Sequence, residues 1–137
     1  MQRYDYLKAI ASHAEDALAV CTGWAAREWC ALRPGEGNLK TRTLGLVSSI
    51  AAGLAIALPH RKVIALDGDG AFLMNLCGLP TIALQSPGNL IHLLFDNEIY
   101  EASGGTATAS RNSDAVILAK GAGYKHALWV SNPAEFA

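Results

Sequence analysis

Residues 68–97 read GDGAFLMNLCGLPTIALQSPGNLIHLLFDN, and they contain the pattern on which our structural prediction rests. An apolar run, Val63–Leu66, leads into the Gly-Asp-Gly turn, and a second apolar run, Leu90–Phe95, ends at Asp96 and Asn97. Short apolar runs bounded by turn residues indicate buried strands, and the segment between them has the length of a helical crossover. Two parallel strands are therefore each followed by an oxygen-bearing side chain.

These two turns predict a site for a metal ion and a diphosphate. Ligands of an open parallel sheet bind beside the carboxyl ends of its strands, so we expect Asp69 and Asn97 to face one crevice. Gly68 and Gly70 allow backbone N–H groups to approach a phosphate closely. Mg²⁺ commonly binds through one or two carboxylates together with substrate phosphates. We expect Asp69 to lie in a turn outside the core.

Strands and helices alternate along the rest of the chain. The spacing of apolar residues, with Gly and Pro as breakers, predicts helices over residues 3–15, 25–32, 46–58, 73–84 and 114–121, and strands over 18–22, 61–67, 89–95 and 126–130. Pro80 should interrupt or delay the fourth helix, and residues 98–112 should form an irregular loop. This alternation favours an α/β fold, a three-layer α/β/α arrangement around a mostly parallel sheet.

Length and composition indicate one domain that works in a reducing compartment. The 137 residues suffice for a single core, and a helix start at Asn132–Glu135 predicts that a last helix and a closing strand are missing. A net charge of −1 gives no reason to expect nucleic acid or a membrane as partner. Three cysteines without C-x-x-C spacing favour packed thiols over disulfides, and hence the cytoplasm.

The chain resembles the thiamine diphosphate enzymes from about Thr22 to Tyr124. The twenty-five residues between G-D-G and Asp96-Asn97 match the spacing of that family's signature. Within the family the chain is similar to the sulfopyruvate and phosphonopyruvate decarboxylases. It shares with them T-G-x-x-x-R-E at 22–28, D-G-D-G-x-x-L-M-N-L at 67–76, and most of D-N-x-x-Y-x-S-T-G-G-Q-x-T at 96–108.

The resemblance implies roles for individual residues. Asp69 and Asn97 would bind Mg²⁺ through their side chains, and Ile99 through its carbonyl group. The backbone N–H groups of Gly70 and Ala71 would hold diphosphate oxygens, and Leu44 would be the apolar wedge that bends the cofactor. The other residues expected at the cofactor are Thr22, Gly23, Gly68 and Tyr100. The resemblance places no catalytic residue on this chain.

The resemblance also implies half of an active site. In these enzymes the glutamate that activates the cofactor lies on a separate pyrimidine-binding domain, and nothing in this chain resembles that domain. We therefore expect a pyrimidine-domain partner subunit, together with self-association of this chain. The expected reaction is decarboxylation of a small 2-oxo acid, most simply one with a sulfonate or phosphonate group.

Three departures from the family pattern leave other functions open. Arg42 replaces a glycine, Ser103 a threonine and Thr106 a glutamine, the last two within the Ser103-Gly104-Gly105-Thr106 loop. They favour, as the alternative, a non-catalytic homologue that binds the cofactor or acts as a scaffold. A dinucleotide-binding domain is a weaker third hypothesis, because no G-x-G-x-x-G follows an early strand.

Overall fold

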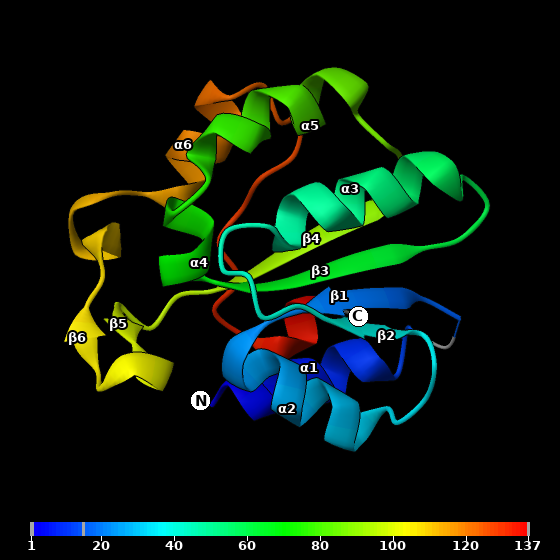
Figure 1. Ribbon diagram of the computed structural model, residues 1–137, viewed down its shortest axis with the longest axis horizontal. Coiled ribbons are helices and arrows are strands. Elements are labelled where there is room, and N and C mark those ends of the chain that lie inside the picture. Colours follow the sequence, from blue (N-terminus) through cyan, green and yellow to red (C-terminus); the bar gives the residue numbers. More distant parts are fainter. Residues whose placement is uncertain (1, 15, 137) are drawn as a thin grey trace.

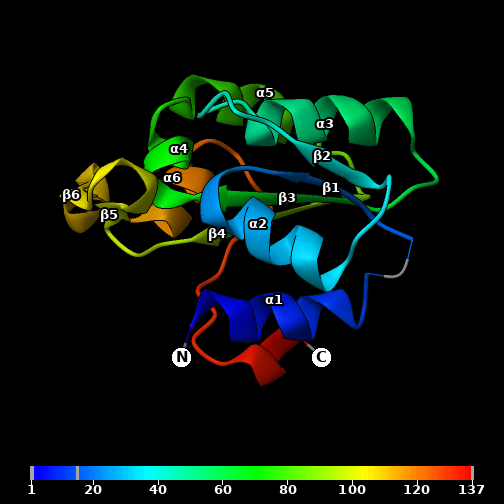
Figure 2. The same ribbon diagram turned by 60° about the horizontal axis from the view of Figure 1, so that its bottom comes forward.

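A computed structural model describes residues 2–14 and 16–136 of the chain. At its centre lies a parallel sheet in the order β2-β1-β3-β4, with helices on both faces (Figures 1 and 2). The strands are β1 (Leu18–Cys21), β2 (Asn38–Lys40), β3 (Val63–Gly68) and β4 (Leu90–Phe95). The predicted three-layer α/β/α class is confirmed. None of the described helices combines the length and the hydropathy that crossing a bilayer requires.

The parallel register brings the ends of the strands to one edge of the sheet. In the central strand, Leu66 pairs with Cys21 of β1 and with Leu93 of β4. Because all neighbouring strands run in the same direction, the residues that follow them gather at the same edge. The G-D-G turn and Asp96 are therefore brought to one side of the molecule by the fold itself.

Helices α1 (Arg3–Ala11) and α2 (Gly23–Leu32) cover one face of the sheet (Figure 1). The largest fully buried side chain of this layer is Trp29, and its indole Nε1 donates a hydrogen bond to Asn38 Oδ1 at 2.9 Å. A buried indole N–H needs such a partner, since leaving it unpaired costs free energy. Trp29 therefore connects the helix layer to the edge strand β2.

Helix α3 (Val47–Ala57) packs against the opposite face. Val47, Ala51 and Ala55 recur every four residues, so they share one side of the helix, and all three are buried. They form one cluster with Val63 and Ala65 of β3. The predicted helix over 46–58 is confirmed, and its small side chains allow the helix to lie close to the sheet.

The crossover between β3 and β4 differs from the single helix that we predicted over 73–84. It consists of α4 (Asp69–Leu73), a 3₁₀ turn (Leu76–Gly78) and α5 (Leu79–Gln85). Pro80 lies in the first turn of α5, where its missing N–H costs no hydrogen bond. The delay at Pro80 is thus confirmed, whereas the separate helix at Asp69 was not foreseen.

Residues 98–112, predicted as an irregular loop, contain a small hairpin. Its strands are β5 (Ile99–Tyr100) and β6 (Thr106–Ala107), with 3₁₀ turns at Glu101–Ser103 and Ala109–Asn112. Helix α6 (Ala115–Gly121) follows, as predicted, and Asp114 caps it by accepting a hydrogen bond from the Ile117 N–H at 2.9 Å. The chain then reaches a final 3₁₀ turn at Pro133–Phe136.

One further prediction is corrected in the first forty residues, and one strand there was not predicted. The helix predicted over 3–15 ends at Ala11, and Glu15 lies outside the described residues. The apolar spacing that predicted the longer helix included Ala14. This residue is buried, at 2% exposed, but it lies beyond the end of the helix. Strand β2 was not predicted, because its three residues are largely exposed and carry no apolar run.

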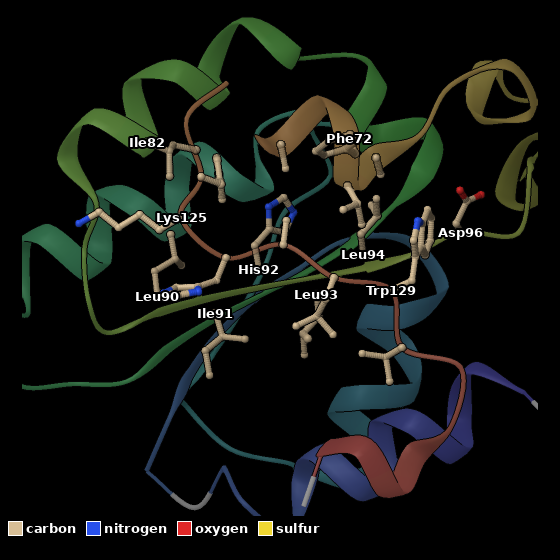
Figure 3. Close-up of a pocket in the computed structure, with 18 of the residues that line it drawn as sticks. Phe72, Ile82, Leu90, Ile91, His92, Leu93, Leu94, Asp96, Lys125 and Trp129 are labelled. Atoms are coloured by element: carbon tan, nitrogen blue, oxygen red, sulfur yellow. The ribbon is translucent and has the colours of Figure 1, made fainter. Parts of the chain in front are cut away.

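The strand predicted over 126–130 is wrong. These residues have no strand hydrogen bonding, and a hollow of about 960 Å³ separates them from β4. Figure 3 shows Leu90, His92 and Leu94 projecting from β4 toward Phe72 and Ile82, with Lys125 and Trp129 on the segment that passes in front. Apolar composition indicated a strand, but a strand also needs a neighbouring backbone within hydrogen-bonding distance.

Candidate functional site at the carboxyl edge of the sheet

The G-D-G turn joins the end of β3 to the start of α4. The Gly68 N–H donates to Asp67 Oδ1 at 3.0 Å, and Asp69 is the first residue of the helix. Asp69 is only 3% exposed, so our expectation of a turn residue outside the core is wrong. Gly70 and Ala71 are buried beside it in the first turn of α4.

The buried Asp69 carboxylate is held by two hydroxyl groups that our sequence analysis did not single out. Thr108 Oγ1 donates a hydrogen bond to Asp69 Oδ2, and Ser110 Oγ lies 3.1 Å from the same oxygen. Ser110 Oγ also lies 2.9 Å from Asp96 Oδ1, so its proton can serve either carboxylate. The available signal was the presence of hydroxyl residues in the loop that follows Asp96 and Asn97.

The hairpin packs directly on the G-D-G turn. A Cβ atom built on Gly70 would overlap the ring of Tyr100 and would lie 3.2 Å from Thr108 Cγ2. Only a residue without a side chain allows this close approach. The structure therefore brings Tyr100, which we predicted at the cofactor, against Gly70.

Asn97 and Ile99 are arranged around the start of the same hairpin. Asn97 Oδ1 accepts a hydrogen bond from the Ile99 N–H at 3.2 Å. Across the hairpin, the Thr108 N–H donates to the Glu98 carbonyl at 2.9 Å and the Gly105 N–H to the Tyr100 carbonyl at 3.0 Å. Both hydrogen bonds use the carbonyls on either side of Ile99, so neither occupies the Ile99 carbonyl.

The chemistry of these oxygen atoms fits Mg²⁺. Among the described residues, Thr108 and Ser110 both hydrogen-bond to Asp69 Oδ2 rather than to Oδ1. A carboxylate, the Asn97 amide oxygen and a backbone carbonyl are all hard donors of the kind that Mg²⁺ prefers. Within the described residues, no three His, Cys, Asp or Glu side chains form a metal-binding group, so a site here depends on this mixed set.

Thr22 and Gly23 follow β1 at the same edge of the sheet. Thr22 is 6% exposed, and its hydroxyl donates to the Thr41 carbonyl at 3.0 Å. Gly23 begins α2 with a φ of +61°, which favours glycine. The Thr22 hydroxyl is thus engaged with the backbone that leads toward Arg42 and Leu44.

Leu44 lies in the turn before α3 and is 42% exposed. The neighbouring Gly45 is fixed beside α4, because Asn75 Nδ2 donates to the Gly45 carbonyl at 2.7 Å and to Ser49 Oγ at 3.3 Å. This contact connects the Leu44 turn to the segment that directly follows α4. An exposed leucine at this place remains available for the wedge role.

Charged side chains of α1 and α2 also reach this edge. Arg3 makes ion pairs with Glu28 at 2.9 Å and with Glu101 at 2.8 Å. Hydrogen bonding to Glu28, and then to Glu101, raises the pKa of the Arg3 guanidinium above its ordinary value, against the lowering effect of burial. The Arg27 guanidinium lies over the ring of Trp24, 4.6 Å from its centroid.

Comparison with known families identifies the class to which this chain belongs. Residues 19–137 match the family described as thiamine pyrophosphate enzyme, C-terminal TPP binding domain. Thiamine pyrophosphate is another name for thiamine diphosphate. The chain is therefore a member of this family, and our prediction of thiamine diphosphate with Mg²⁺ as the cofactor is confirmed for the family.

Individual relatives agree with the narrower resemblance. The chain is 38% identical to sulfopyruvate decarboxylase subunit beta of Methanothermobacter thermautotrophicus, covering 90% of this chain and 68% of the relative. It is 34% identical to phosphonopyruvate decarboxylase of Streptomyces hygroscopicus, covering 80% of this chain and 27% of the relative. The chain thus spans about two thirds of the first relative and about a quarter of the second.

A solved structure supports the fold. The 2-oxoglutarate:ferredoxin oxidoreductase from Magnetococcus marinus, determined with 2-oxoglutarate, coenzyme A and succinyl-CoA bound, aligns with a TM-score of 0.64. The two chains are 22% identical, and the alignment covers 77% of this chain and 38% of the oxidoreductase. At this level of identity the likeness concerns the architecture alone.

Proposed function

We propose that this chain is a single diphosphate-binding domain of a thiamine diphosphate-dependent 2-oxo acid decarboxylase. The observation that carries the proposal is the cluster formed by the G-D-G turn and the D-N hairpin in a member of this family. When bound, the cofactor supplies a thiazolium ring that accepts electrons as carbon dioxide leaves. The residues of this chain bind and orient that cofactor.

We assign the metal and the diphosphate to specific atoms. One oxygen of Asp69, the amide oxygen of Asn97 and the carbonyl of Ile99 hold Mg²⁺. Thr108 and Ser110 keep the Asp69 carboxylate in one orientation through their hydroxyl groups. The backbone N–H groups of the first turn of α4 hold diphosphate oxygens. The remaining cofactor contacts in the proposal are Thr22, Gly23, Leu44, Gly68, Gly70, Ala71 and Tyr100.

The proposal includes a partner subunit that carries the pyrimidine-binding domain. The printed name of the Methanothermobacter relative, subunit beta, supports an assembly of unlike subunits. Large apolar side chains are also exposed around this edge of the sheet, where a partner or a second copy of the chain would cover them. These side chains are Trp24, Leu44, Leu46 and Met74.

The substrate in this proposal is a small 2-oxo acid with a second anionic group, such as a sulfonate or a phosphonate. The names of the relatives support this class. We place the protein in the cytoplasm, which the free thiols of Cys21, Cys30 and Cys77 support.

The metal site is tested by binding of thiamine diphosphate. Asp69→Asn keeps the size of the side chain and an acceptor for Thr108, but it removes the charge. Loss of a ligand should exceed the roughly 10–100-fold effect typical of outer-shell partners, so we expect more than about 100-fold weaker Mg²⁺-dependent binding by calorimetry. Asp114→Asn, at the half-buried aspartate that caps α6 and is not one of the proposed ligands, is the control. Equal affinity in the Asp69 variant and the parent would refute the assignment.

The reaction is tested by carbon dioxide release from sulfopyruvate and phosphonopyruvate. We expect none from the isolated chain with thiamine diphosphate and Mg²⁺, and turnover once a pyrimidine-domain subunit is added. Steady turnover by the isolated chain would contradict the half-site proposal. Cofactor binding without turnover in any assembly would favour the scaffold alternative, and Arg42→Gly would then be the first variant to test for restored activity.

A further inference from the structure

Glu101 contacts the nitrogen end of the Asn97 amide. Asn97 Nδ2 donates to Glu101 Oε2 at 3.4 Å, while Asn97 Oδ1 accepts from the Ile99 N–H. An asparagine side chain presents an oxygen or a nitrogen depending on how its amide is rotated, and only the oxygen binds a metal ion. A carboxylate accepts hydrogen bonds and cannot donate them, so it favours the nitrogen on its own side.

Glu101 is in turn fixed by Arg3. Arg3 Nη1 lies 2.8 Å from Glu101 Oε2, the same oxygen that accepts from Asn97. The other side of the guanidinium fork is paired with both carboxylate oxygens of Glu28, through Nε and Nη2 at 2.9 Å each. Two nitrogens bound to one carboxylate define the plane of the guanidinium, which leaves Nη1 aimed at Glu101.

The ion pair between Arg3 and Glu28 is largely shielded from solvent, unlike an exposed surface pair. The Arg3 side chain is 19% exposed and that of Glu28 27%, so the fork is shielded between α1 and α2. Glu101 is 41% exposed and follows the hairpin strand that carries Ile99. The N-terminal helix, α2 and the hairpin thus meet in one connected set of hydrogen bonds that ends at Asn97.

We infer that Glu101 is a positioning residue for the metal site, and that Arg3 and Glu28 hold it in place. Glu101 binds the amide nitrogen of Asn97 and so turns the amide oxygen toward the position of Mg²⁺. The inference rests on the proposed function, because it assigns the means by which this chain orients one ligand of that same site. It adds residues from α1 and α2, both far from the G-D-G turn in sequence.

Glu98 provides a matched control for Glu101. It is also a glutamate close to Asn97, but its carboxylate pairs with Arg111 at 3.4 Å, and both side chains of that pair are more than half exposed. Replacing either glutamate by alanine removes one negative charge near the metal. Only Glu101→Ala removes the hydrogen-bond acceptor from the Asn97 amide.

The first test measures Mg²⁺-dependent thiamine diphosphate binding by calorimetry, in the assembly in which the chain purifies. Glu101→Ala should weaken binding about 10–100-fold, as loss of an outer-shell partner does. Glu98→Ala should change it by no more than about fivefold, the size of an exposed charge contribution. Equal effects of the two variants would overturn the inference, because charge alone would then explain both.

The second test removes the need for orientation. Asn97→Asp has two equivalent oxygens and no amide nitrogen, so Glu101→Ala should no longer weaken binding in that background. A loss that persists there would mean that Glu101 acts through general stability, which would overturn the inference. Unchanged affinity in Asp69→Asn would instead refute the metal site, and this inference with it.

A third measurement needs neither metal nor cofactor. The side-chain amide resonances of Asn97 in nitrogen-15 NMR spectra should move in Glu101→Ala and Arg3→Ala, and should stay in place in Glu98→Ala. Absence of any movement in Glu101→Ala would show that the contact is not populated, and the inference would fall while the proposed function would stand.

Discussion

The sheet with its first helices and the region after β4 are stabilised in different ways. Among the residues whose burial the structure describes, every buried apolar side chain lies between Leu7 and Ile82. From residue 96 onward, Thr108 alone is buried among the described side chains, and it is polar. The first region is held by apolar packing on both faces of the sheet, whereas the second is held at the site by hydroxyl and carboxylate contacts.

The two parts of the site that carry the proposed ligands are therefore held in different ways. Asp69 is carried by the start of a helix that follows β3, in which every residue except the last is buried. Asn97 and Ile99 are carried by a short hairpin whose position depends on Gly70, Ser110 and Glu101. Burial of apolar area is non-directional, and it stabilises the part of the site that carries Asp69. Hydrogen bonds are directional, so they determine where the ligand atoms of Asn97 and Ile99 point.

The largest effect should come from the core of the first region. Trp29→Ala should lower the free energy of unfolding by about 3–5 kcal/mol, because it leaves a cavity and removes the hydrogen bond to Asn38 Oδ1. Trp129→Ala is the matched substitution in the second region, where the side chain is 52% exposed, and it should cost under about 1 kcal/mol. Chemical denaturation of both variants gives the two free energies of unfolding. Similar losses would show that the two regions are equally packed.

An intermediate effect is expected where the two regions touch. Gly70→Ala places a Cβ atom against the Tyr100 ring and should lower the free energy of unfolding by about 1–3 kcal/mol. Amide hydrogen exchange in the hairpin should also become faster. Gly53 lies in α3, and a Cβ atom built on it meets no neighbouring atom within 4 Å. Gly53→Ala should therefore raise the free energy of unfolding by roughly 0.5–1 kcal/mol. Thermal unfolding and hydrogen exchange test both. A neutral Gly70→Ala would mean that the hairpin does not rest on α4.

The smallest effect concerns the cap of α6 and depends on pH. The hydrogen bond from the Ile117 N–H is the main cause that lowers the pKa of Asp114 below its ordinary value. A group whose pKa is lower in the folded state stabilises above its unfolded pKa of about 3.9, and this contribution is lost as the pH falls through the folded value. Protection of the Ile117 amide should therefore decrease in acid.

Asp114→Asn is the control for this prediction. Its side chain still accepts the capping hydrogen bond but carries no charge, so protection at Ile117 should not change with pH between about 6 and 3. Protection factors from hydrogen exchange, corrected for the intrinsic rate, give the comparison. The same acid dependence in both proteins would assign the effect to another group.

The sequence by itself determined the order of the layers and the residue types at the site. Apolar runs before Gly68 and Asp96 identified β3 and β4, and parallel strands then place both turns at one edge. Apolar segments bounded by Gly and Pro are local signals as well, and they located α2, α3 and α6. The resemblance carried by the spacing of G-D-G and D-N led to the right family.

The tertiary structure alone decided how the site is held. The carboxylate of Asp69 is buried against the hydroxyl groups of Thr108 and Ser110. Gly70 likewise packs against Tyr100, and in both cases the partners are distant in sequence. The absence of a strand over 126–130 has the same origin, because pairing depends on where another backbone lies. Local pattern reports what a segment prefers, whereas these contacts depend on which partners the whole fold brings within hydrogen-bonding distance.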